Sequence, residues 1–341
     1  MKIKNSKSIF FLFIIITVMS IMFGLFYYVS ISYSDYRDKN EAIEHIVLIN
    51  KFDAVLSNID EEKLCSAIYM GTKNKKELKK LKVYREFVDL EVEQLLGFLD
   101  KHREKSYYKE SIKDIFKNLN YIRTRVDIIN MDNRGTLFEY YTNKIDNKLI
   151  GLIQNMVQES LLGNSGRFYY YMKLSKLKEN LNTEKAFISF ILSGSIKMNS
   201  QDLLLWENFI KNDISPNFYK RLDNVVTIAK LTQIINPKIF PIMTDELRGK
   251  IFINSIDGRY SISLMNWIKQ SVQKIQKVDS AKKLLIIELE NNIKNELNSS
   301  KDITIKLTIA TILIFILFIT LVYLFRNNII NNRLLVDTLK D

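Results

Sequence analysis

The chain has 341 residues, 47% of them hydrophobic, and a net charge of +12 from 50 basic and 38 acidic residues. The lysines are dispersed among acidic residues rather than gathered in one stretch, which argues against a nucleic-acid-binding surface. Cys65 is the only cysteine, so no internal disulfide can form. The two histidines, His45 and His102, lack metal-ligand spacing, so the pattern predicts neither a metal nor a cofactor.

An uncharged apolar run from Ile9 to Ser30 opens the chain. It can cross a hydrocarbon core of about 30 Å as a helix, which takes roughly 20 residues. The basic residues before it also suit a cleaved signal peptide, but the run exceeds the usual apolar length of about 7 to 15 residues and no A-x-A site follows. We therefore predict a short cytoplasmic N-terminus (1–8) and an uncleaved transmembrane helix (9–30).

Residues 31–303 are predicted to form one helical domain. All three prolines, which disrupt helix interiors, fall between residues 216 and 241 and leave long helices possible on both sides. Apolar residues recur at steps of three and four, as on a helix with one buried face. These stripes are Ile46, Ile49, Phe52, Leu56 and Ile59; Ile115, Leu119, Ile122, Val126 and Ile129; Leu174, Leu177, Leu181, Ile188 and Leu192; and Ile268, Val272, Ile275, Ile286, Leu289, Ile293 and Leu297.

A faint duplication relates the two halves of this domain at an offset of 122 residues. It carries Glu62-Lys63 onto Glu184-Lys185, and a downstream aromatic pair onto another: Tyr84, Phe87 and Val88 match Trp206, Phe209 and Ile210. The repeat favours an all-α fold, an extended helical bundle of two stacked or nested four-helix units lying between two transmembrane helices.

Two duplicated lysines are the candidate ligand-binding residues. Lys63 lies four positions after Ile59 and Lys185 four after Leu181, so both fall on apolar faces. A buried ammonium needs a counter-charge: a neighbouring carboxylate, solvent reached by extending the side chain, or a bound anion. Because the feature occurs twice, a shared anion is one explanation. Arg123 is a third candidate at the edge of its stripe, where an exposed position fits equally well.

A second uncharged run, Leu307–Phe325, predicts a transmembrane helix at 304–325. Basic residues precede the first run and follow the second, which predicts that both termini are cytoplasmic and that 31–303 lies outside the cytoplasm. The tail, 326–341, is too short for a kinase, a cyclase or a receptor signalling hairpin. We therefore expect a missing output domain or a cytoplasmic signalling partner.

Several segments resemble the nitrate- and nitrite-sensing (NIT) domain of bacterial receptors. These are LNYIRTRVD (119–127), FEYYTNKIDNKLIGLIQNM (138–156), LKENLNTEKAFISFILSG (177–194) and, more weakly, EEKLCSAIYMG (61–71), with Trp267 before the exit helix. The resemblance implies two four-helix bundles between two transmembrane helices in the bacterial plasma membrane, commonly as a homodimer. It also implies an anion held by arginines in Glu-Arg motifs, whose matching positions here are Lys63 and Lys185. The ammonium of lysine is a point charge, whereas the guanidinium of arginine is a planar fork of donors. Small anions other than nitrate and nitrite are therefore also possible ligands.

The predicted function is therefore that of a transmembrane sensor that binds a small inorganic anion and transmits the signal across the membrane. The alternative is a non-signalling membrane scaffold or assembly protein with a degenerate sensor domain. No Gly-rich phosphate loop, nucleophile elbow or paired catalytic histidine is present, so we do not expect an enzyme.

Overall fold

The computed structural model describes residues 2–101, 108–129, 134–158, 165–211, 222 and 224–337. Every regular element in these ranges is a helix, which confirms the predicted all-α class. The chain forms two compact units. One is Ala42–Asn291, called here the bundle. The other combines Met1–Glu41 with Asn292–Asp341 and is called the two-helix unit.

Two very long helices begin and end the fold. Helix α1 covers Lys2–Thr72 and helix α10 covers Leu264–Asp337, each without a break. Both contain a stretch long and apolar enough to cross a membrane. The first and last helices of the bundle therefore continue the two apolar runs, as predicted. No proline interrupts either helix, so neither loses a backbone hydrogen bond in its interior.

The first half of the bundle contains the end of α1, then α2 (Lys75–Lys101), α3 (Tyr108–Asp127), α4 (Arg134–Tyr140), η2 (Tyr141–Asp146) and α5 (Asn147–Gln158). Elements α4, η2 and α5 follow one another directly and act as one helix with a π-helical turn at η2. Such turns are rare and often occur at functional sites. Here the turn buries Tyr141, Ile145 and Asp146 together.

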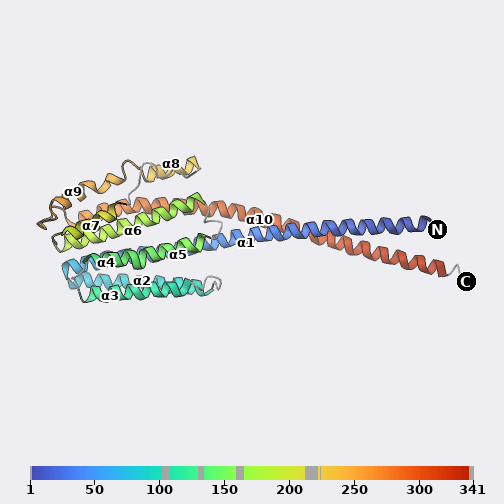
Figure 1. Ribbon diagram of the computed structural model, residues 1–341, viewed down its shortest axis with the longest axis horizontal. Helices are drawn as coiled ribbons and strands as arrows, with labels where there is room; N and C mark the ends of the chain where they lie inside the picture. Colours follow the sequence, from blue (N-terminus) through green and yellow to red (C-terminus); the bar gives the residue numbers. More distant parts are fainter. Residues whose placement is uncertain are drawn as a thin grey trace. The chain divides into compact units, whose positions relative to one another are not determined.

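The second half contains α6 (Gly166–Ser193), α7 (Ser200–Ile210), α8 (Val225–Ile234), η3 (Pro241–Thr244), α9 (Asp245–Ile253) and the start of α10. Figure 1 shows the helices of both halves within the bundle. The proline window separates short helices as expected: α8 ends at Ile234 and Pro241 starts η3. Pro216 lies outside the described residues.

Most residues of the predicted apolar stripes are buried, but on α10 Ile268, Val272 and Leu297 are partly exposed. All five members of the α1 stripe, Ile46 to Ile59, are at most 1% exposed, and α6 is buried on most of its faces. The α3 stripe is shorter than expected. Helix α3 ends at Asp127, and Ile129 has a φ of 46°, a conformation that a β-branched residue rarely adopts and that ends the helix before this position.

Within the two-helix unit, polar side chains join α1 to α10. The hydroxyls of Ser32 and Thr304 are 2.7 Å apart. Lys39 donates to Ser300 Oγ at 2.7 Å and to Asp35 at 2.8 Å, and Ser300 donates to Asp35. These hydrogen bonds lower the pKa of Asp35, with Lys39 as the largest cause. The two long helices are therefore linked next to their apolar runs.

Candidate functional site

Lys63 lies in a fully buried cluster of charged residues. Its side chain is 0% exposed, and its Nζ is 2.6 Å from Asp146 Oδ2, 3.1 Å from Asp60 Oδ1 and 3.9 Å from Glu179 Oε2. It also donates to Thr183 Oγ1 at 3.3 Å. We call Asp60, Lys63, Asp146 and Glu179 the core charge cluster. It joins α1, η2 and α6.

Electrostatics in this cluster are dominated by burial and by an excess of carboxylates. Burial opposes the Lys63 ammonium, but Asp146, Asp60 and Glu179 outweigh it and raise the pKa of Lys63 above its usual value. Burial raises the pKa of Asp146 to about 6 and raises that of Glu179 well above its usual value. One oxygen of each, Asp146 Oδ1 and Glu179 Oε2, is buried without a hydrogen-bond partner.

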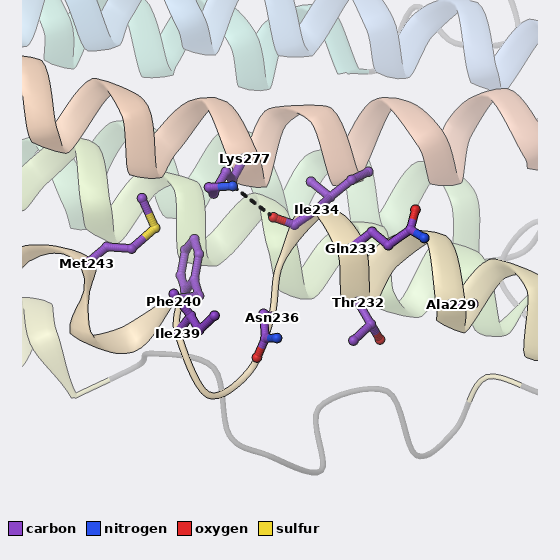
Figure 2. Close-up of a pocket in the computed structure, with 9 residues that line it drawn as sticks. All are labelled: Ala229, Thr232, Gln233, Ile234, Asn236, Ile239, Phe240, Met243 and Lys277. Atoms are coloured by element: carbon purple, nitrogen blue, oxygen red, sulfur yellow. Dashed lines mark hydrogen bonds between the residues drawn. The ribbon is translucent and has the colours of Figure 1, made fainter.

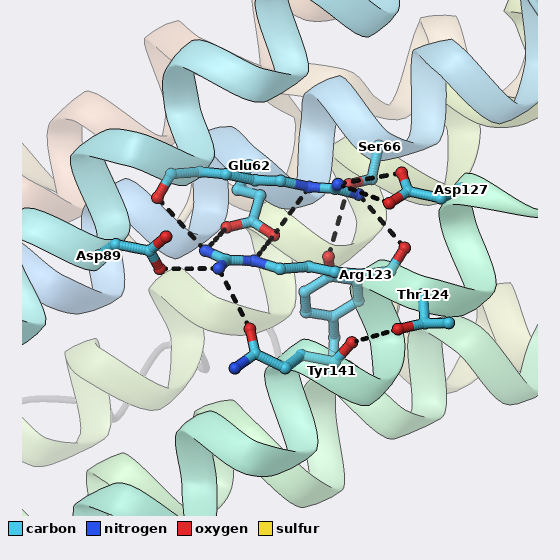
Figure 3. A network of polar contacts seen from close by, with 9 residues as sticks. Glu62, Ser66, Asp89, Arg123, Thr124, Asp127 and Tyr141 are labelled. Atoms are coloured by element: carbon cyan, nitrogen blue, oxygen red, sulfur yellow. Dashed lines mark hydrogen bonds and ion pairs between the residues drawn. The ribbon is translucent and has the colours of Figure 1, made fainter.

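Arg123 belongs to a second network, centred on the fully buried Glu62 (Figure 3). Its Nε and Nη2 donate to the two Glu62 oxygens at 2.9 and 2.7 Å, and its Nη1 donates to Asp89 at 2.7 Å. Arg85 and Arg123 also donate to each other's backbone carbonyl at 3.3 Å. Burial opposes the charge of Arg123, but the Glu62 hydrogen bonds outweigh it and raise the pKa. Arg123 is therefore a half-buried structural partner of Glu62 rather than an exposed residue.

The second repeat contains a matching arrangement around Glu184. Arg248 Nε and Nη2 donate to its two oxygens at 2.8 and 2.7 Å, and Trp206 Nε1 donates at 3.0 Å. Lys185 is 2% exposed and donates to Glu61 at 3.2 Å. Each repeat thus buries a glutamate whose two oxygens accept a bidentate pair of hydrogen bonds from one arginine, an arrangement that is among the strong charged hydrogen bonds.

Lys63 and Lys185 therefore both lie at the α1–α6 interface, where each contacts a residue of the other helix, whereas Arg123 lies on α3 and contacts Glu62. In the structure the counter-charge of each cation is a carboxylate, one of the alternatives that the sequence left open. Sequence reasoning missed Asp146, Glu179 and Arg248. Asp146 could not be placed because the π-helical turn shifts the helical period on which a stripe depends. Among the described residues no cluster of three or more His, Cys, Asp or Glu could hold a metal ion.

A separate groove of about 510 Å³ lies between the α8–η3 segment and α10 (Figure 2). Lys277 on α10 lies at its edge, and its ammonium donates a long 3.5 Å hydrogen bond to the Ile234 carbonyl. The lining combines apolar and polar side chains: Ala229, Thr232, Gln233, Ile234, Asn236, Ile239, Phe240, Met243 and Lys277. An open groove with one exposed cation and apolar walls suits a small anionic ligand.

No model of a known protein family matches the chain, and no curated protein and no solved structure matches it.

Proposed function

We propose that this chain is a membrane-anchored sensor whose helical bundle lies outside the cytoplasm and passes a binding signal through its two long helices. One observation carries the proposal. Helix α10 lines the groove through Lys277 and, without a break, also contains the second candidate membrane span. A ligand that contacts Lys277 therefore contacts the same helix that would cross the membrane.

Such a sensor needs two states with different affinity for the ligand. Polar side chains link α1 to α10 in one register, through Ser32 and Thr304 and through Asp35, Lys39 and Ser300. A small displacement of one helix along the other would exchange these hydrogen bonds for others. Hydrogen bonds of this kind contribute about 0.5 to 1.5 kcal/mol each, so a ligand of ordinary affinity can shift the balance.

The proposed ligand is a small anion. In the bundle core, Lys63, Lys185 and Arg123 each hold a carboxylate, so an anion there would have to displace a buried partner. At the groove, Lys277 is exposed, and an anion that binds it would displace no carboxylate among the contacts described in this structure. The apolar walls of the groove, formed by Ile239, Phe240 and Met243, contribute little affinity for a hydrated inorganic ion. They favour an organic anion that has an apolar part.

The test is calorimetric titration of the full chain in detergent micelles with nitrate, nitrite, benzoate and short-chain carboxylates. We expect binding of a carboxylate that is weakened at least about tenfold in Lys277→Gln. Lys269→Gln, which removes an exposed lysine two turns earlier on α10, is the matched control and should bind normally.

Three other outcomes separate the hypotheses. Binding of nitrate that is lost in Lys63→Ala or Lys185→Ala, and kept in Lys277→Gln, would place the anion in the core and overturn the groove assignment. Binding that survives all three substitutions would exclude both sites. If no anion binds the wild-type chain, the sensor proposal fails and the scaffold or assembly function becomes the better reading.

A further inference from the structure

Glu179 on α6 is buried in the core charge cluster, where three carboxyl groups surround the ammonium of Lys63. Asp146 and Asp60 lie 2.6 and 3.1 Å from Lys63 Nζ, whereas Glu179 Oε2 is 3.9 Å away and is buried with no hydrogen-bond partner. Of the three carboxyl groups, Glu179 therefore has the weakest contact with the cation, and a buried carboxylate without a partner is costly. The geometry therefore calls for a proton at this position.

We propose that the core charge cluster is a proton-binding site, with the proton on Glu179 at neutral pH, and that its release weakens the packing of α6 against α1 and η2. On release, the O–H bond of the carboxylic acid breaks, the electron pair stays on the carboxylate and the proton passes to water. The buried cluster then gains one negative charge.

The charges around Glu179 explain why it retains a proton. Asp60 and Lys63 face it from α1, and Asp146 faces it from η2. Lys178, its neighbour on α6, donates to Asp279 of α10 and to Ser57, both at 3.0 Å, and its ammonium also attracts Asp60 and Glu179. With every group ionised, three buried carboxylates would lie within 3.9 Å of one ammonium, that of Lys63, which is costly away from water.

The direction of the pH effect follows. Burial, then Asp60 and Asp146, raise the pKa of Glu179 well above its usual value, so the folded state binds a proton that the unfolded chain has already lost. Between the pKa of Glu179 in the unfolded chain and its higher pKa in the folded state, the free energy of unfolding therefore falls as pH rises. Because α1 also contains the first candidate span, a change of protonation acts on a helix of the proposed signalling path. The core charge cluster shares no residue with the groove, so protonation of Glu179 does not depend on a ligand at Lys277.

The experiment measures thermal unfolding of the full chain in detergent micelles between about pH 5 and about pH 9. We expect the Tm of the wild type to fall with rising pH, and Glu179→Gln, which mimics the protonated acid, to keep a higher Tm at alkaline pH and a flatter profile. Glu184→Gln is the matched control. This residue lies five positions further along α6 and is also buried, but both of its oxygens accept hydrogen bonds from Arg248, so its substitution should lower the Tm at every pH without flattening the profile.

A direct measurement keeps the proposal testable even if Glu179→Gln does not fold. In infrared spectra of the wild type at neutral pH, a protonated carboxylic acid gives a C=O band that shifts when glutamate is isotope-labelled. We expect that band, and we expect it to vanish at high pH. The absence of a protonated-acid band, or a band that shifts with labelled aspartate instead of glutamate, would overturn the assignment, as would equal pH profiles for wild type and Glu179→Gln.

Discussion

Asp60 on α1 accepts a 2.5 Å hydrogen bond from Asn182 on α6, and these two residues are 122 positions apart. The same offset relates Lys63 to Lys185. Lys63 reaches across the interface to Thr183, and Lys185 reaches back to Glu61, whose offset from Thr183 is again 122. Equivalent residues of the two repeats thus exchange contacts across one interface. The duplication is therefore expressed in the packing of α1 against α6.

Removing Arg248 should strongly destabilise the bundle. Arg248→Met leaves the buried carboxylate of Glu184 with a hydrogen bond from Trp206 but without its ion pair, and breaking a buried ion pair from one side costs about 3 to 5 kcal/mol. Chemical unfolding of the chain in micelles measures the loss. The control is Arg125→Met, on the exposed face of α3, which should cost less than about 1 kcal/mol. A second substitution, Glu184→Gln, should recover part of the Arg248→Met loss, and strict additivity would contradict direct coupling.

Gly71→Ala should destabilise the protein because α1 and α6 approach closely at this glycine. An added Cβ would lie 2.8 Å from the Phe190 backbone carbonyl, which cannot turn away as a side chain can. We expect a loss of about 1 to 3 kcal/mol in the free energy of unfolding. At Gly97 on α2 an added Cβ meets nothing within 4 Å, so Gly97→Ala should stabilise by about 0.5 to 1 kcal/mol. Equal effects at the two sites would contradict the close approach.

Cys65 should report unfolding. It is buried on α1, and burial, followed by the charge of Glu61, raises the pKa of its thiol to about 12. Because the thiolate is the reactive form, iodoacetamide should modify the folded chain far more slowly than the unfolded chain at mildly alkaline pH. Mass spectrometry along a denaturant series should show labelling that follows the loss of helical signal. Rapid labelling under native conditions would show that this part of α1 opens.

A disulfide should lock α1 to α10 in the two-helix unit. The side chains of Ser32 and Thr304 meet at 2.7 Å, so Ser32→Cys with Thr304→Cys, in a Cys65→Ser background, should cross-link on mild oxidation. The neighbouring residue Tyr33 is 58% exposed, so Tyr33→Cys with Thr304→Cys is the control and should cross-link poorly. Gel mobility after oxidation measures both. Similar yields would mean that the two helices have no single register.

Much of the fold was predictable because its signals are local. Apolar runs and stripes need only the helical period, and the stripe from Ile46 to Ile59 is buried as that period requires. The stripe also placed Lys63 inside the core, four positions beyond Ile59. The end of α3 was not predictable in this way, because the positive φ at Ile129 comes from the turn that follows the helix.

The sequence by itself determined the helical class, the two apolar runs, the continuity of α1 and α10 with the bundle, and the burial of Lys63 and Lys185. These properties depend on residue spacing within one helix. Only the tertiary structure decided what neutralises the buried cations. Asp146 and Glu179 reach Lys63 from helices more than 80 residues away, and the π-helical turn at η2 gives Asp146 its direction. Ion pairs form where packing brings charges together, and periodicity along one helix carries no information about its neighbours.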